Sequence, residues 1–513
     1  MENKAKRKVT MVTRIGYGMG GFIGGGGLSL AHTWLLFFYT AFCNLNAWQA
    51  ALIFSIATYL DMIENPLIGF LSDNFNSTSL GKKFGRRRFF LLVSIPFLML
   101  YPLVWLTGQN FIYYMLTYII YDFVDNVFNV AYGTLRCEMT EDYNERQFLS
   151  GALSIGGQAA GFINSGLPVI FFLWLGKNNP HSYQAMVIAY SLILVISALA
   201  VYLTSWELPV NDVKVENIDN FWEGLKKLFH DIFSTFRIRT FRWHIGMYIF
   251  GSGGLWLFSA ITTFFYIYVL NKSTVFASGL GTALKPVELF STFLAIWLCA
   301  KMKDTAKPYI MGLIGVIVSM LAYSAIWFFG LNQSTALIVV AAVILELASG
   351  ICYYVPSTNY VYMPDIDEIV TNRRREGVYS GAQGMAGKVM RGTVVLVAGI
   401  VLSKTGFVKG LKSQPISAQI GIVMMMLIGI CGLTLLAIWC SRHMKADEKS
   451  ISAINTEIKR VHNGGRLADA TPETKALVKE LTGFDYEHCF GNNNVGYKEK
   501  NTSTTPPTSA LTK

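Results

Sequence analysis

The chain has 513 residues, of which 52% are apolar and only 15% are charged, and its mean hydropathy is +0.40. This composition excludes an ordinary water-soluble enzyme of this size and indicates a membrane protein. The net charge of +11 is typical of a membrane protein whose cytoplasmic loops are rich in Lys and Arg, so it does not indicate a nucleic-acid partner. The seven cysteines show no spacing that is typical of a metal site or of a disulfide framework.

About twelve segments are apolar and long enough to cross a membrane, which takes about 20 residues. They are approximately residues 15–42, 48–72, 89–106, 111–135, 148–175, 183–204, 245–270, 277–299, 309–329, 335–363, 378–402 and 418–440. The basic residues gather in alternate loops, and both termini belong to the same set. By the positive-inside rule both termini are therefore expected in the cytoplasm. The sequence predicts an all-α membrane protein in two six-helix halves.

The longest internal break separates the halves and holds a basic amphipathic stretch from Phe221 to Phe236, which we expect to form a helix at the membrane interface. The predicted domains are an N-terminal half (1–205), a cytoplasmic central loop (206–243), a C-terminal half (244–441) and a cytoplasmic polar tail (442–513). Ser150-Gly151-Ala152 with Gly157-Gln158 recurs as Ser380-Gly381-Ala382 with Gly387-Lys388, a short repeat between the halves.

Two helices are expected in the polar tail. The first covers 448–462, and the second begins at Thr471-Pro472, which has a good capping residue followed by proline at the first helical position. The segment from Gly491 onward is expected to be disordered, because it is polar and rich in Asn, Thr and Pro.

Ionisable side chains at membrane depth are costly and indicate function. The second span holds Asp61, Glu64 and Asn65, and at about 100° per residue these three side chains share one face. The fourth span holds a polar stripe, the eleventh holds two cations, and four further ionisable residues stand alone or near helix ends. The stripe is Asp122, Asp125, Asn126 and Asn129, the cations are Lys388 and Arg391, and the isolated residues are His32, Lys285, Glu288 and Glu346.

These groups either pair with one another inside the bundle or bind a cation. Carboxylate and amide oxygens suit a hard cation such as sodium, and a buried carboxyl group suits a proton equally well. The sequence leaves the two cations open. For the four isolated residues we expect a structural role.

Several motifs, in order and at matching spans, resemble the glycoside, pentoside and hexuronide cation symporters of the major facilitator superfamily. The resemblance covers roughly residues 13–443. It depends on Gly16-Tyr17-Gly18-Met19-Gly20, on 61–69 with Asp73 and Gly85 to Arg88, on 132–146, on Tyr268 to Asn271, and on 365–377. It implies the major facilitator fold, alternating access, and sugar import coupled to sodium, lithium or protons across the inner membrane.

By this resemblance, Asp61 corresponds to the family's leading cation-site carboxylate, Asn126 to a polar ligand on the fourth helix, and Lys388 to a lysine between the cation and sugar sites. The chain departs from melibiose-type members at Asn65, where they have a second acid, and at Gly24 to Gly27, where they have a sugar-binding acid. It departs again at Asn129, Gly133 and Leu153 or Ser154. The galactoside specificity is therefore not transferred.

We expect a secondary active transporter that imports a sugar or glycoside with a sodium ion or proton, acts as a monomer and needs no cofactor. The expected cation ligands are Asp61, Glu64, Asn65, Asp122 and Asn126. The expected sugar contacts are Tyr118, Tyr121, Asp125, Asn129, Tyr353, Lys388 and Arg391. Charge pairs that gate the cytoplasmic side are expected among Asp73, Arg86, Arg87, Arg88, Glu138, Arg146 and Arg374.

Two alternatives stay open from the sequence. A major facilitator exporter, or a transporter of another small solute, would also show about twelve spans and buried acids. A membrane-embedded enzyme is less well supported, because the sequence has no nucleophile, metal or nucleotide motif.

Overall fold

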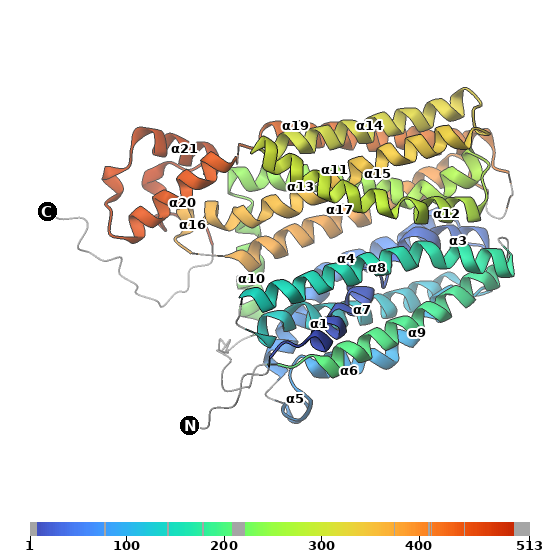
Figure 1. The fold of residues 1–513 in the computed structure, drawn as a ribbon, viewed down its shortest axis with the longest axis horizontal. Helices are drawn as coiled ribbons and strands as arrows, with labels where there is room; N and C mark the ends of the chain where they lie inside the picture. Colours follow the sequence, from blue (N-terminus) through green and yellow to red (C-terminus); the bar gives the residue numbers. More distant parts are fainter. Residues whose placement is uncertain are drawn as a thin grey trace.

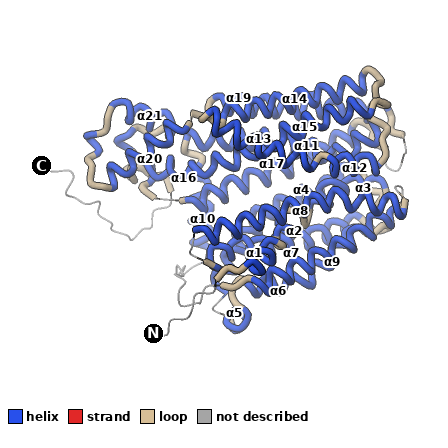
Figure 2. The backbone as a smooth tube through the Cα atoms, viewed as in Figure 1, coloured by secondary structure: helices blue, strands red, loops and turns tan. Residues whose placement is uncertain are grey.

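The computed structural model describes residues 8–75, 78–140, 143–176, 179–207, 221–373, 375–408, 411, 413–445 and 447–496. Within these residues all regular structure is helical and no strand occurs (Figure 2). The predicted all-α class is confirmed.

The N-terminal part of the chain holds six helical segments at the positions of the first six predicted spans. The first is broken into α1 (Met11–Gly18), α2 (Gly21–Gly24), a π-helical turn (Ala31–Leu35) and α3 (Leu36–Ala41). The others are α4 (Ala47–Asn74), α6 (Arg88–Phe97) with its 3₁₀ continuation (Leu98–Trp105), α7 (Phe111–Met139), α8 (Tyr143–Leu175) and α9 (Pro180–Thr204), and a short α5 (Ser79–Phe84) precedes α6.

The C-terminal part repeats this arrangement after α10 (Phe221–Thr235), which is the predicted helix of the central loop. Two of its spans are interrupted, one between α12 and α13 and one by a π-helical turn between α18 and α19. The spans are α11 (Arg239–Phe264) with Phe265–Val269, α12 (Thr274–Ala283) with α13 (Lys285–Met302), α14 (Ala306–Phe328), α15 (Thr335–Asn359), α17 (Glu376–Lys404), and α18 (Ile416–Met424) with Met425–Ile430 and α19 (Cys431–Arg442); α16 (Met363–Thr371) joins α15 to α17.

Ten helices in the described residues are long and apolar enough to cross a membrane. The first span is not among them because a run of glycines divides it into short pieces. The second predicted span that is missing from these ten is α7, because its polar stripe lowers its mean hydropathy. It has 29 residues, roughly 43 Å of helix, and it packs along α4 inside the bundle. These two segments complete the twelve predicted spans.

The polar tail packs on the bundle at the end that carries both chain termini (Figure 1). Its helices α20 (Glu448–His462) and α21 (Pro472–Thr482) begin as predicted, and the side chain of Thr471 caps α21 by accepting from the Thr474 N–H. The disorder expected from Gly491 is wrong for 491–496. The backbone N–H groups of Phe490 and Gly491 donate to the carbonyls of Ile369 and Val370 on α16, at 2.7 and 2.9 Å. These hydrogen bonds hold the segment against α16.

The described contacts between the two halves lie from the middle of the bundle to the end remote from the chain termini. Ser55 on α4 donates to the carbonyl of Gly392 on α17 at 2.8 Å. Ser278 on α12 donates to the carbonyl of Ser165 on α8 at 2.9 Å, and Thr263 on α11 donates to the carbonyl of Thr33 at 3.0 Å. In this conformation the remote end is therefore closed.

Candidate functional site

An ion pair and an amide hydrogen bond meet at the carboxylate of Asp61, halfway along α4. Its Oδ2 lies 3.0 Å from the Nζ of Lys388 on α17, and its Oδ1 accepts a hydrogen bond from the Asn126 side chain on α7. Pairing of these charged groups inside the bundle is one of the two alternatives left open by the sequence, and Lys388 and Asp61 form such a pair. Three helices from both halves are therefore joined at one carboxylate.

The polar stripe of α7 faces this carboxylate. Asp122 lies directly beside Asp61, and Asn129 donates to the Oδ2 of Asp125 at 2.8 Å. Asp61, Asp122 and Asp125 are each less than a tenth exposed. Neighbouring buried carboxylates repel one another unless a cation or a proton neutralises them.

The glycine run of the first span makes room for the stripe. A Cβ atom at Gly27 would overlap the Asp125 carboxylate, and one at Gly24 would lie 2.9 Å from the Asn129 Oδ1. At the positions where melibiose-type members have an acid on the first helix, this chain has glycines, and the side chains of Asp125 and Asn129 on α7 fill the space beside them.

Several oxygens of the cluster are buried without a hydrogen-bond partner among the described residues. They are Glu64 Oε2, Asn65 Oδ1 and Asp125 Oδ1. An unsatisfied buried oxygen is costly unless a water molecule or an ion binds it. The donor set of carboxylates and amides fits a sodium ion, which prefers several oxygen ligands.

The cluster is not a preformed three-carboxylate metal site. In the part of the chain that the structure describes, no group of three or more His, Cys, Asp or Glu side chains is arranged to hold a metal ion. Here the ammonium group of Lys388 supplies the positive charge beside Asp61. A cation that bound Asp61 would compete with Lys388 for this carboxylate.

A cavity of about 610 Å³, here called the central cavity, lies between the halves and has Asp61, Asp122 and Asp125 in its wall. Predicted sugar contacts line it from both halves, namely Tyr118, Asn129, Tyr353, Lys388 and Arg391. Arg391 forms no ion pair with any carboxylate that the structure describes, so its guanidinium is available to a ligand. Such a volume with a few convergent polar groups is typical of a small-molecule site.

Tyr121 is not placed in the wall of this cavity. Its ring is buried and stacked on Tyr101, with centroids 4.2 Å apart and planes 11° apart. The prediction of Tyr121 as a sugar contact is therefore not supported, because its side of α7 packs inside the N-terminal half.

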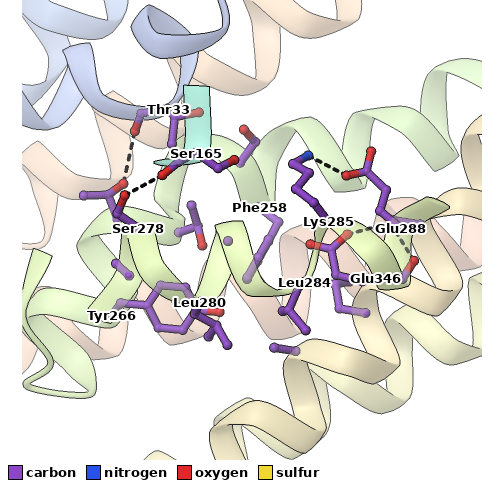
Figure 3. Close-up of a pocket in the computed structure, with 18 of the residues that line it drawn as sticks. Thr33, Ser165, Phe258, Tyr266, Ser278, Leu280, Leu284, Lys285, Glu288 and Glu346 are labelled. Atoms are coloured by element: carbon purple, nitrogen blue, oxygen red, sulfur yellow. Dashed lines mark hydrogen bonds and ion pairs between the residues drawn. The ribbon is translucent and has the colours of Figure 1, made fainter. Parts of the chain in front are cut away.

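A second cavity of about 400 Å³ adjoins the first, and we call it the α12–α13 cavity (Figure 3). It brings together Lys285, Glu288 and Glu346, for which the sequence predicts isolated positions and a structural role. The Nζ of Lys285 lies 2.5 Å from Glu288 Oε2. The expectation of isolation is wrong, because α15 carries Glu346 to the break between α12 and α13.

The predicted sugar contacts do not include Trp256 or His32. Both line the central cavity beside Arg391. A tryptophan that faces a polar cavity is suited to stack on a sugar ring. One signal in the sequence was available for the α12–α13 cavity, since Pro286 directly follows Lys285 inside an apolar span.

The predicted gating residues are only partly described. Glu207 accepts hydrogen bonds from the backbone N–H groups of Arg86, Arg87 and Arg88, at 2.9 Å for Arg86 and 2.8 Å for Arg87. The Arg88 guanidinium lies over the Tyr202 ring, 4.6 Å from its centroid. Arg374 and the side chains of Asp73, Glu138 and Arg146 lie outside the described residues, so the gating role stays a prediction.

Two helical halves around a polar cavity, with an ion pair across their boundary, have the architecture of a membrane transporter whose ligand site lies between two repeats. The profile of the MFS/sugar transport protein family matches residues 16–448. The chain belongs to this family of glycoside/cation symporters within the major facilitator superfamily, and it is a transporter rather than an enzyme.

Relatives with assigned names agree with this membership. The chain is 24% identical over 413 residues to the isoprimeverose transporter of Lactiplantibacillus pentosus, with 79% of this chain and 82% of that protein covered. It is 23% identical over 500 residues to an uncharacterised symporter of Synechocystis, with 82% and 90% covered. The fold is similar to that of a D-xylose–proton symporter, with a TM-score of 0.60 at 13% identity over 85% of this chain and 97% of the other.

Proposed function

We propose that this protein imports a sugar or glycoside by symport with a sodium ion or a proton. The observation that carries the proposal is the carboxylate of Asp61, which is shared between Lys388 and Asn126 across the two halves. A single carboxylate in contact with both halves suits coupling, because a cation bound to it changes the interactions that join the halves. Family membership supports a sugar and a cation as the ligands.

The proposed cation ligands are Asp61, Glu64, Asn65, Asp122 and Asn126. The buried oxygens of Glu64 and Asn65 that lack partners among the described residues support this assignment. A sodium ion would bind these oxygens directly, and a proton would bind one of the carboxylates. Either ion would weaken the hold of Asp61 on Lys388.

The proposed sugar contacts are Tyr118, Asp125, Asn129, Tyr353, Lys388 and Arg391, with Trp256 as a stacking surface. When a cation displaces Lys388 from Asp61, the three N–H donors of its ammonium group become available to sugar hydroxyls in the central cavity. By linkage, each ligand then raises the affinity of the other by the same factor.

We place the protein in the cell's inner membrane with both termini in the cytoplasm, because the basic loops lie at the end of the bundle that carries the termini. On this orientation the outer end is the closed one. Arg86, Arg87 and Arg88 then lie on the cytoplasmic side, where we assign them, with Asp73, Glu138, Arg146 and Arg374, to charge pairs that stabilise the outward-open state.

The test is uptake of a labelled neutral glycoside, such as isoprimeverose, into vesicles that contain the purified protein. An imposed sodium or proton gradient should drive accumulation above the external concentration, and counterflow should occur without a gradient. An exporter, the competing class, would not accumulate the sugar in vesicles whose orientation matches that of the cell. Failure of every glycoside under both gradients would contradict the proposal.

A further inference from the structure

The α12–α13 cavity lies at a break in a transmembrane helix. Pro286 has no N–H to continue the helical hydrogen bonding of α12, and α13 starts anew with the N–H groups of Val287 and Glu288 on the Leu284 carbonyl, at 2.9 and 3.1 Å. Broken helices at membrane depth are tolerated where they line a cavity, and in transporters they mark ligand sites.

This break carries charges that the ion pair of the central cavity does not use. Lys285 pairs with Glu288. The Glu346 carboxylate, in contrast, has no Lys or Arg partner among the described residues and accepts only a weak hydrogen bond, from the Ser349 hydroxyl at 3.4 Å. Figure 3 shows Lys285, Glu288 and Glu346 together at one end of the cavity, with Thr33, Ser165 and Ser278 at the other. The cavity thus offers one carboxylate in excess and a wall of hydroxyl groups.

A buried amide in the same wall also lacks a partner. Asn164 is 5% exposed, and its Nδ2 donates to the Gly26 carbonyl at 3.0 Å. Its Oδ1 has no hydrogen-bond partner in the described part of the chain. A hydroxyl donor from a ligand would satisfy this oxygen.

The two cavities are continuous in their walls, because Ser29, Thr33, Ser259 and Tyr353 line both. Lys285 also reaches the opposite half, since its Nζ would lie 3.8 Å from a Cβ atom at Gly161 of α8. A sugar ring that enters the joined cavities therefore has the polar wall of the α12–α13 cavity beside it, between α8 and the helix break.

The charge balance of the joined cavities disfavours an anion. Among the residues that the structure describes, five carboxylates line them, on Asp61, Asp122, Asp125, Glu288 and Glu346, against three cationic side chains, on Lys285, Lys388 and Arg391. With one monovalent cation or one proton bound, these carboxylates still exceed the positive charges by one. Carboxylates accept hydrogen bonds from sugar hydroxyls, but they repel a uronate group.

We propose that the α12–α13 cavity is a sugar subsite, and that Glu288 and Glu346 make the transporter selective for neutral glycosides over hexuronides. In this subsite Glu346 and Asn164 accept from sugar hydroxyls and Lys285 donates to them. The proposal rests on the proposed function and names the substrate class of that same site.

The experiment compares two probes that differ only at one carbon, methyl β-D-glucoside and methyl β-D-glucuronide. Each is tested for inhibition of glycoside counterflow by the full-length protein in vesicles. The wild type should bind the glucoside at least about tenfold more tightly, and Glu346→Gln and Glu288→Gln should each reduce this ratio by about tenfold, because a nearby negative charge is removed. Asp304→Asn, which neutralises a loop carboxylate outside both cavities, should leave the ratio unchanged.

A structural role of the acids would lower the amount of folded protein without changing the ratio of the two affinities. Asn164→Ala provides a second test, with an expected loss of about fivefold or more in glucoside affinity. A wild type that prefers the glucuronide, or Gln variants whose ratio stays within about twofold of the wild type, would overturn the subsite proposal. Wild-type vesicles that respond to neither probe and transport no glycoside would overturn the proposed function and this inference with it.

Discussion

The ammonium group of Lys388 on α17 lies 3.0 Å from the Asp61 carboxylate on α4, and the same carboxylate accepts a hydrogen bond from Asn126 on α7. Removing one partner of an ion pair at membrane depth leaves the other charge uncompensated, which is costly. The pair is therefore stable only while no other cation binds Asp61. This relationship connects the cation cluster to the cavity wall.

Asp61→Asn should lower the accumulation of sugar against its gradient by about tenfold or more. The reason is that the amide neither binds a cation strongly nor forms an ion pair with Lys388. Downhill exchange of sugar should be less affected. Uptake into vesicles with and without a cation gradient measures both, and Glu223→Gln on the exposed face of α10 is the matched control. Full accumulation by the Asn variant would remove Asp61 from the coupling mechanism.

Gly27→Ala should lower transport strongly, because the new Cβ atom would overlap the Asp125 carboxylate. Displacement of Asp125 should disturb its hydrogen bond with Asn129. Initial rates of counterflow are compared with those of Gly133→Ala, where an added Cβ atom meets nothing within 4 Å. Equal rates for the two variants would mean that the close approach at Gly27 is not needed.

Gly399→Val should favour the state that is open at the end remote from the chain termini. A Cβ atom at Gly399 would overlap the Cβ of Ala51 and lie 2.7 Å from the Ala47 carbonyl oxygen, so α17 could no longer pack on α4 there. We expect faster labelling of Ser29→Cys, in a background without the native cysteines, by a membrane-impermeant thiol reagent added outside. Gly384→Val, at a site with open space, is the control, and unchanged labelling would contradict this account of closure.

The docked tail should lose order in acid. Hydrogen bonds from Arg460, together with one from the Tyr486 hydroxyl, hold the pKa of the Glu457 carboxyl below its usual value of 4.5. A group with a lowered folded-state pKa contributes stability above its unfolded pKa and loses it as the pH falls through the folded pKa. Amide exchange of 448–496, corrected for its intrinsic pH dependence, should therefore rise below about pH 4.

In Glu457→Gln this pH dependence should be weaker, because the titrating group is gone. The variant should also show faster exchange at pH 7, since a charge-assisted hydrogen bond is worth about 1.5–3 kcal/mol. If amide exchange in the Gln variant rises in acid by the same amount as in the wild type, carboxylates other than Glu457 cause the loss of order.

The spans and their order could be predicted because a membrane helix needs a long apolar run, and the helix bounds agree within a few residues over 89–106 and 335–363. Helical periodicity placed Asp61 with Glu64, and it placed Asp122 with Asp125. It could not show that Glu346 meets Lys285, because their spans are separated by another helix. It also could not distinguish Tyr118 from Tyr121, because the two side chains are only about 60° apart around α7. Tyr118 lies in the cavity wall, whereas Tyr121 stacks on Tyr101 inside the N-terminal half.

The Asp61–Lys388 exchange is the central claim, and Lys388→Gln tests it directly. The dissociation constant of the transported sugar is measured with purified wild-type and variant protein, with and without the coupling cation. In the wild type the cation should tighten sugar binding about fivefold or more, a typical coupling energy. In Lys388→Gln weak sugar binding should persist with the same constant in both buffers, whereas an undiminished effect of the cation in the variant would make Lys388 a structural counter-charge and contradict the account.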